Sequence, residues 1–117
     1  MKTLLDREIL SIEDTIIPVA LELGRPEEPL TTAIAIKVLV RQTPLRRMVD
    51  VEHGVRIVEV VRSANGVIPL EEAEYAWLMN QLEETGPAVF RLNALQVKAA
   101  LQDFAPEIRE SPDTSKG

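Results

Sequence analysis

Apolar residues dominate the chain after residue 30, and their spacing predicts a mainly helical fold. The segment 31–42, TTAIAIKVLVRQ, is apolar nearly all round and begins with threonines suited to cap a helix. It ends at Thr43-Pro44, because the residue before a proline disfavours the helical region. Its centre, 33–40, is also good strand material, and periodicity does not decide between the two for so short an apolar run. We expect a helix here, with a strand as the alternative.

The segment 50–64, DVEHGVRIVEVVRSA, is expected to form a central helix that is buried on most sides. Its charged residues fall on one narrow stripe of a helical wheel, and valines cover much of the rest. Asp50 is placed to cap the helix, and Asn65-Gly66 is placed to end it. The alternative is a strand over 55–61 that leads into a hairpin turn at Asn65-Gly66.

Two further helices are expected, at 70–85 and 88–103. Gly86 is expected to stop the first of them and Pro87 to start the second. The glutamates at the start of the first helix complement the positive end of its dipole, so Glu71, Glu72 and Glu74 are assigned to a solvated face. The apolar positions assigned to the interior of these two helices are Ala73, Trp77, Leu78, Leu82, Leu92, Leu95, Ala99 and Phe104.

The two ends of the chain are the hardest parts to assign. Thr3–Leu5 and Glu8–Leu10 are expected to pair as a short β-hairpin or to remain extended. Thr15–Leu23 is apolar but is interrupted by a proline. The polar composition of 107–117 is typical of a disordered tail. The sequence therefore predicts one globular domain over 1–106, mainly α with α+β left open, built from about four helices.

The composition restricts the core and the compartment. With 45% hydrophobic and only 3% aromatic residues among 117, the core must be aliphatic. The chain has no cysteine, which excludes disulfides, thiolate metal sites and cysteine nucleophiles. No uncharged run is long enough to span a bilayer, and the N-terminus lacks the apolar stretch of a signal peptide. We therefore expect a soluble, cytoplasmic protein with no membrane partner.

Charge is distributed unevenly along the chain, whose formal net charge is −6. Residues 1–30 hold three basic and seven acidic side chains, residues 31–66 hold six basic and three acidic ones, and residues 67–117 hold four basic and nine acidic ones. A polyanion would be repelled by most of such a chain, so nucleic acid is an unfavoured partner. A protein segmented in this way can instead attract a basic protein or copies of itself.

The sequence contains no recognisable catalytic, cofactor-binding or metal-binding constellation. The glycine-rich phosphate loops, the nucleophile elbow and the zinc-protease motif are all missing from it. His53 is the only histidine, and a zinc site would need more ligands than it can supply, so we assign it to the edge of an apolar helix face. The close approach of a neighbouring helix would account for Gly54 beside it. We expect neither a cofactor nor enzyme activity.

Six residues are the candidates for contact with a partner. Arg41, Arg46 and Arg47 form the densest basic patch, which lacks the glycines of a phosphate site and the aromatic residues of a nucleic-acid surface. This patch is expected either to be solvated or to reach the acidic pair Glu83-Glu84 or the tail of another subunit. The sixth candidate is Trp77, which is expected to pack in the interior unless it is exposed as an interface anchor.

The order of features from about residue 29 to 101 resembles a group of small acidic proteins encoded by tailed bacteriophages. PLTTAIAIKVLV precedes a valine-rich helix, and SANGVIPLEEAEYAWLMNQLEE and GPAVFRLNALQVKAAL follow it. In that group a helix ends at an Asn/Asp-Gly turn, a short strand leads into a Glu-rich helix, and a break at a proline leads to a last helix. Glu71 stands where such proteins usually show a Ser or Thr cap. The resemblance implies a phage or prophage origin, and hence the host cytoplasm, but implies no site residues.

These observations favour a non-enzymatic protein–protein interaction module of the phage type, which acts in virion assembly or binds a host protein and associates with itself. The alternative is a small nucleic-acid-associated regulator that uses the basic segment 41–62.

Overall fold

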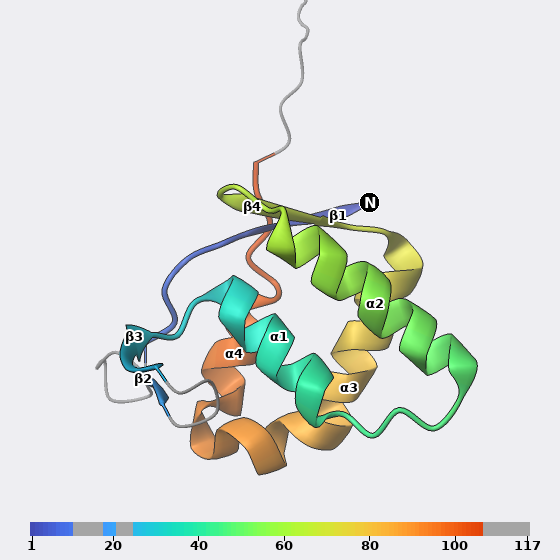
Figure 1. Cartoon of the computed structure of the whole chain (residues 1–117). Coiled ribbons are helices and arrows are strands. Elements are labelled where there is room, and N and C mark those ends of the chain that lie inside the picture. The colour runs from blue at the N-terminus through green and yellow to red at the C-terminus, as the bar shows by residue number, and fades with distance from the viewer. Residues whose placement is uncertain (11–17, 21–24, 107–117) are drawn as a thin grey trace, which may run out of the picture.

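The computed structural model describes residues 1–10, 18–20 and 25–106, and consists mainly of helices packed in two layers under a small β-sheet (Figure 1). The helices are α1 (Thr32–Gln42), α2 (Met48–Arg62), α3 (Glu72–Phe90) and α4 (Ala94–Ala100). The residues with no exposed surface lie where these helices meet the sheet, and include Leu4, Ile36, Leu39, Ile57, Ile68, Leu78, Val97 and Leu101. The core is aliphatic, as the composition predicts.

Helix α1 lies at the centre of the fold. The Thr31 hydroxyl accepts a hydrogen bond from the backbone N–H of Ile34 at 3.3 Å, which caps the helix. Seven of its eleven residues are buried, because α1 contacts α2, α3 and α4. The prediction of a helix over 31–42 is confirmed, and the strand alternative for 33–40 is wrong.

Helix α2 confirms the predicted helix at 50–64 and rules out a strand over 55–61, but it is not the central element. Only Gly54, Ile57 and Val61 are buried among its residues. The physical reason is that α1 occupies the interior, so α2 packs on it along one face and leaves much of the valine surface exposed. Asp50 does not occupy the N-cap position, which belongs to Arg47.

The predicted break between the last two helices is wrong. Helix α3 continues through Gly86 and Pro87 to Phe90, and a 3₁₀ turn then leads directly into α4. Within the described ranges the chain thus forms three helical bodies rather than four: α1, α2 and this continuous run. The departure from regular helix geometry within this run lies at Arg91, whose φ of 57° is unusual for a residue with a side chain.

The predicted interior of the last two helices is wrong at five positions. Leu92 and Leu95 are 75% and 68% exposed, and Phe104 is 41% exposed; Ala73 and Ala99 are exposed as well. A continuous helical wheel places the two leucines inward, but the change of direction at Arg91 shifts the phase of the helix. Val97, Ala100 and Leu101 are the residues that α4 and its C-terminal end bury.

The sheet above the helices pairs β1 (Lys2–Leu5) with β4 (Val67–Leu70) in antiparallel register, Leu4 opposite Ile68. The predicted hairpin between Thr3–Leu5 and Glu8–Leu10 is therefore wrong. Asp6, which lies between these two segments, does not form a hairpin turn. Its carboxylate accepts a hydrogen bond from the backbone N–H of Ala33, in the first turn of α1, at 3.0 Å. The N–H of Ile9 then donates to the carbonyl of Leu30 at 2.9 Å.

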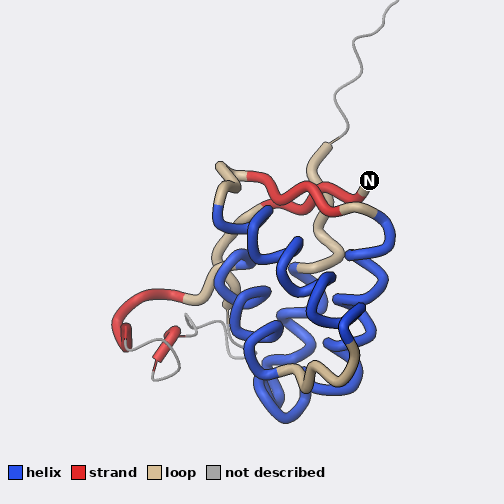
Figure 2. Tube along the Cα trace, turned by 45° about the vertical axis from the view of Figure 1, so that its right-hand side comes forward, coloured by secondary structure: helices blue, strands red, loops and turns tan. Residues whose placement is uncertain are grey.

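A second pair of strands, β2 (Pro18–Ala20) and β3 (Arg25–Pro29), is antiparallel and stands away from the helical body (Figure 2). The apolar stretch Thr15–Leu23 falls mostly, and the tail 107–117 entirely, outside the described residues. None of the helices that are described has the length and apolar character needed to cross a membrane.

Candidate functional site

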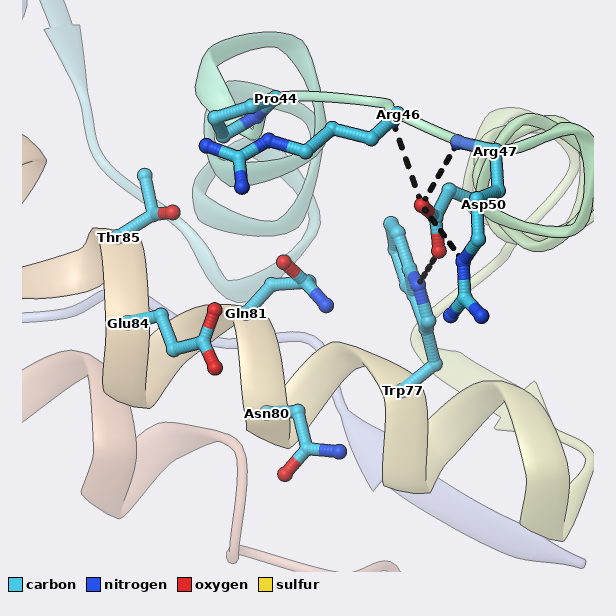
Figure 3. A pocket seen from close by; sticks show the side chains of 9 residues that line it. All are labelled: Pro44, Arg46, Arg47, Asp50, Trp77, Asn80, Gln81, Glu84 and Thr85. Atoms are coloured by element: carbon cyan, nitrogen blue, oxygen red, sulfur yellow. Dashed lines mark hydrogen bonds and ion pairs between the residues drawn. The ribbon is translucent and has the colours of Figure 1, made fainter.

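A cleft of about 530 Å³ lies between the loop that joins α1 to α2 and the exposed side of α3 (Figure 3). We call it the loop cleft. Figure 3 shows Arg46 and Arg47 on the loop side and Trp77, Gln81 and Glu84 along α3. The residues that line the cleft are Pro44, Arg46, Arg47, Asp50, Trp77, Asn80, Gln81, Glu84 and Thr85.

Asp50 holds the loop side of this cleft in place. One carboxylate oxygen accepts hydrogen bonds from the backbone N–H groups of Arg46 and Arg47, at 3.3 and 3.1 Å. The other accepts from the indole N–H of Trp77 at 3.1 Å. The bond from Trp77 lowers the pKa of Asp50 most, with burial acting in the opposite direction and the two backbone bonds adding to the decrease. Asp50 is therefore ionised, and its carboxylate holds the loop against α2 and α3.

Trp77 is 9% exposed, so its prediction as a packing residue is confirmed. Its ring packs against the imidazole of His53, with 5.8 Å between the ring centroids. One side of the indole thus belongs to the interface of α2 with α3, and another lines the loop cleft. His53 is partly buried at the edge of the helix face, where the sequence places it.

Glu74 is buried, so its assignment to a solvated face is wrong. Only 6% of the residue is exposed, and one carboxylate oxygen bonds both Nδ1 of His53 and a guanidinium N–H of Arg56, each at 3.2 Å. The helical wheel of α2 pairs Arg56 with Glu52 and Glu59 on its own helix, whereas the packing of α3 against α2 brings Glu74 closer. A single-helix pattern carries no signal for such an interhelical contact.

The hydrogen bonds of Glu74 predict how the protein responds to acid. Burial favours the neutral form and raises the pKa of this carboxyl, but the bonds with His53 and Arg56 outweigh it, so the pKa lies below its ordinary value of 4.5. A carboxylate with a lowered pKa stabilises the fold above that value, and the stabilisation is lost as the pH falls through the folded-state pKa.

We expect Glu74→Gln to be less stable than the wild type at neutral pH, by about 1–2 kcal/mol, and this difference to shrink as the pH falls below 4.5. Urea unfolding of both proteins across a series of pH values measures this difference in the free energy of unfolding. Glu84→Gln is the matched control, because Glu84 is exposed on the same helix and takes part in none of the ion pairs that the described residues form. A difference that is independent of pH would contradict this role of Glu74.

The six candidate residues do not form one site. The loop cleft brings together four of them, Arg46, Arg47, Trp77 and Glu84. Glu83 is directed elsewhere and forms an ion pair with Lys98 at 3.2 Å. Arg41 borders a different surface, described next. The alternative in which the arginine patch pairs with Glu83-Glu84 is not among the ion pairs formed by the described residues.

An apolar groove of about 410 Å³ lies along α2, on residues that the sequence predicts to be buried. We call it the valine groove. Val51, Val55 and Val58, spaced to share one helix face, form its floor together with Gly54, and Val40 and Leu45 close one side. Arg41, Glu59 and Arg62 complete its lining. The spacing of these valines is the sequence signal for the groove, but the same spacing also predicts a buried flank of a central helix.

Gly54 sets the distance between the two helices at this groove. A β-carbon built on Gly54 would lie 3.3 Å from Cγ1 of Val40, tighter than an ordinary contact. The predicted reason for this glycine, the close approach of a neighbouring helix, is confirmed. The glycine therefore allows α1 to lie close to α2 beside the valine groove.

A second apolar surface, which we call the leucine patch, consists of Leu92 and Leu95 just after α3. Backbone strain at Arg91 precedes it directly, and strained non-glycine residues tend to occur at functional positions. Among the described residues, no group of three or more potential metal ligands gathers in one place.

Comparison with known proteins found no family model, no curated protein and no solved structure that matches the chain.

Proposed function

We propose that the protein is a non-enzymatic protein–protein interaction module that binds a partner through the valine groove and associates with itself through the leucine patch. The observation that carries the proposal is the exposure of large apolar side chains on both surfaces. Val55 is 51% exposed, and Leu92 and Leu95 are 75% and 68% exposed. Contiguous exposed apolar surface on a folded domain is typical of interaction sites.

The loop cleft supports the same proposal. Its two arginines, its carboxamides and the edge of an indole are the residue types that surround the apolar centre of a protein interface. Asp50 is occupied by three hydrogen bonds and Glu74 by two partners, so both carboxylates stabilise the arrangement of α2 and α3. We assign these two carboxylates a structural role and the surface around them a binding role.

The resemblance to small acidic phage proteins indicates where the proposed module would act. Such a module, in the cytoplasm of an infected host cell, would act in virion assembly or bind a host protein.

The molar mass in solution tests the self-association. We expect the wild type to have a mass of at least twice the 13.0 kDa of one chain. The double variant Leu92→Lys/Leu95→Lys is expected to have the mass of one chain, because a charged amine is expensive to bury in an apolar interface. Light scattering after size-exclusion chromatography measures both. Met48→Lys is the matched control, since Met48 is 71% exposed and lies far along the chain from the patch. A wild type that remains monomeric at high concentration would contradict this part of the proposal.

A nucleic-acid-associated regulator is the second candidate. The observation that favours it is the exposure of Arg41, Arg46, Arg47 and Arg62 on one helical hairpin. Two findings count against it: Arg56 is bound to Glu74, and the valine groove between Arg41 and Arg62 is apolar, whereas a phosphate backbone needs a continuous positive track.

A further inference from the structure

The valine groove has the length of a short helix. Its lining runs along α2 from Val51 to Arg62, which at the rise of a helix is about 16 Å, or about eleven residues. Its floor is made of small branched side chains and one glycine, a surface onto which the larger apolar side chains of another helix can pack. Grooves of this kind bind amphipathic helices through an apolar face.

Exposed arginines lie at the two ends of the groove, and they favour a helix that carries acidic side chains beside its apolar face. Arg41 lies at the C-terminal end of α1, and Arg62 lies at the C-terminal end of α2. Both side chains are exposed, and neither forms an ion pair with any residue that the structure describes. Arg46 and Arg47 follow Leu45 directly in sequence and extend the positive charge beyond one end. Glu59 is the one acidic residue in the lining.

A second copy of α2 fits this groove poorly. If two α2 helices packed antiparallel about Val55, Glu52 of one copy would stand beside Glu59 of the other, because these residues lie three positions before and four positions after Val55. Two carboxylates that face each other across an interface repel, and this repulsion opposes the pairing of two α2 helices. The same packing would also bring the positive ends of two identical grooves together.

We infer that the valine groove binds an amphipathic helix of a partner protein whose apolar stripe is flanked by acidic side chains. This inference rests on the proposed function and specifies the partner of the groove. Apolar residues of the partner would cover Val51, Val55 and Val58, and its carboxylates would pair with Arg41 and Arg62. The pairs at the ends determine which helix binds, while the apolar contact supplies most of the affinity.

Two labelled synthetic helices test this inference. Each has about sixteen residues, enough to cover the groove, and both carry the same leucine stripe. The flanking positions are Glu in one and Lys in the other. Fluorescence anisotropy against the full chain is expected to show about tenfold tighter binding of the Glu peptide, since each exposed ion pair contributes modestly.

Three variants separate the apolar from the ionic contribution. Val55→Gln is expected to weaken binding of the Glu peptide at least tenfold. Val49→Gln, at a position that is 41% exposed on α2 and outside the groove lining, is expected to leave it unchanged. Arg41→Glu/Arg62→Glu is expected to reverse the preference toward the Lys peptide. Circular dichroism checks that each variant remains folded.

The inference is overturned if the wild type binds the Lys peptide as tightly as the Glu peptide, or if neither peptide binds. Failure here is distinguishable from failure of the proposed function, because photo-crosslinking from position 55 detects a partner protein at the groove whatever its charge, and the molar mass of the wild type tests self-association without any peptide. A labelled DNA duplex is included in the same assay. If the protein binds neither peptide but binds this duplex in a salt-sensitive way, the inference is overturned and the nucleic-acid regulator is favoured.

Discussion

Trp77→Ala is expected to lower the free energy of unfolding by about 3–5 kcal/mol, a large part of the total stability of a domain of this size. The indole is 9% exposed, packs against His53 and donates the hydrogen bond that connects α3 to Asp50. Its removal leaves a cavity at the interface of α2 with α3. It also releases the carboxylate that holds Arg46 and Arg47 at the start of α2.

Urea unfolding followed by far-UV circular dichroism measures this effect. Trp77→Phe is the informative control, because a phenyl ring preserves much of the packing and removes only the N–H donor. We expect it to cost about 1 kcal/mol. An alanine variant as stable as the phenylalanine variant would mean that the indole contributes little packing and would contradict the described position of Trp77.

Gly54→Leu is expected to lower the free energy of unfolding by about 3 kcal/mol, because overpacking a close helix contact forces the backbones apart. The first added atom would already lie 3.3 Å from Val40, and three more carbons follow it. Gly54→Ala is expected to be within about 1 kcal/mol of the wild type, since the higher helix propensity of alanine offsets the tight contact.

A double variant identifies the cause of that loss. Adding Val40→Ala to Gly54→Leu makes room at the contact, so the double variant is expected to be more stable than the sum of the two single changes predicts. Thermal or urea unfolding of the four proteins completes the cycle. Strict additivity would show that Val40 and Gly54 do not meet.

The sequence predicts the helices of this fold better than the way they pack. The segments 31–42 and 50–64 are apolar enough that helix and strand are the only choices, and the capping threonine at residue 31 favours the helix. Which helix is central depends on contacts between elements. A wheel of α2 alone displays a broad valine surface, but it does not show that α1 covers only one side of it.

The sequence predicts only part of the candidate site, because the rest depends on contacts between helices. Arg46 and Arg47 stand out as a basic pair, and Trp77 stands out as the single tryptophan. The role of Glu74 does not stand out, because its partners His53 and Arg56 lie 21 and 18 residues away on another helix. The exposure of Leu92 and Leu95 follows from the positive φ of Arg91, a backbone feature for which an arginine gives no sequence signal.

The central claim is that the protein acts by holding another protein at the valine groove, and photo-crosslinking from that groove tests it most directly. The photoreactive residue p-benzoylphenylalanine replaces Val55, or Ala73 on the exposed face of α3 as a control, in the cell that naturally makes the protein. We predict a discrete adduct with a different protein from position 55, identified by mass spectrometry, and none from position 73. No adduct from position 55, or the same adducts from both positions, would contradict the claim.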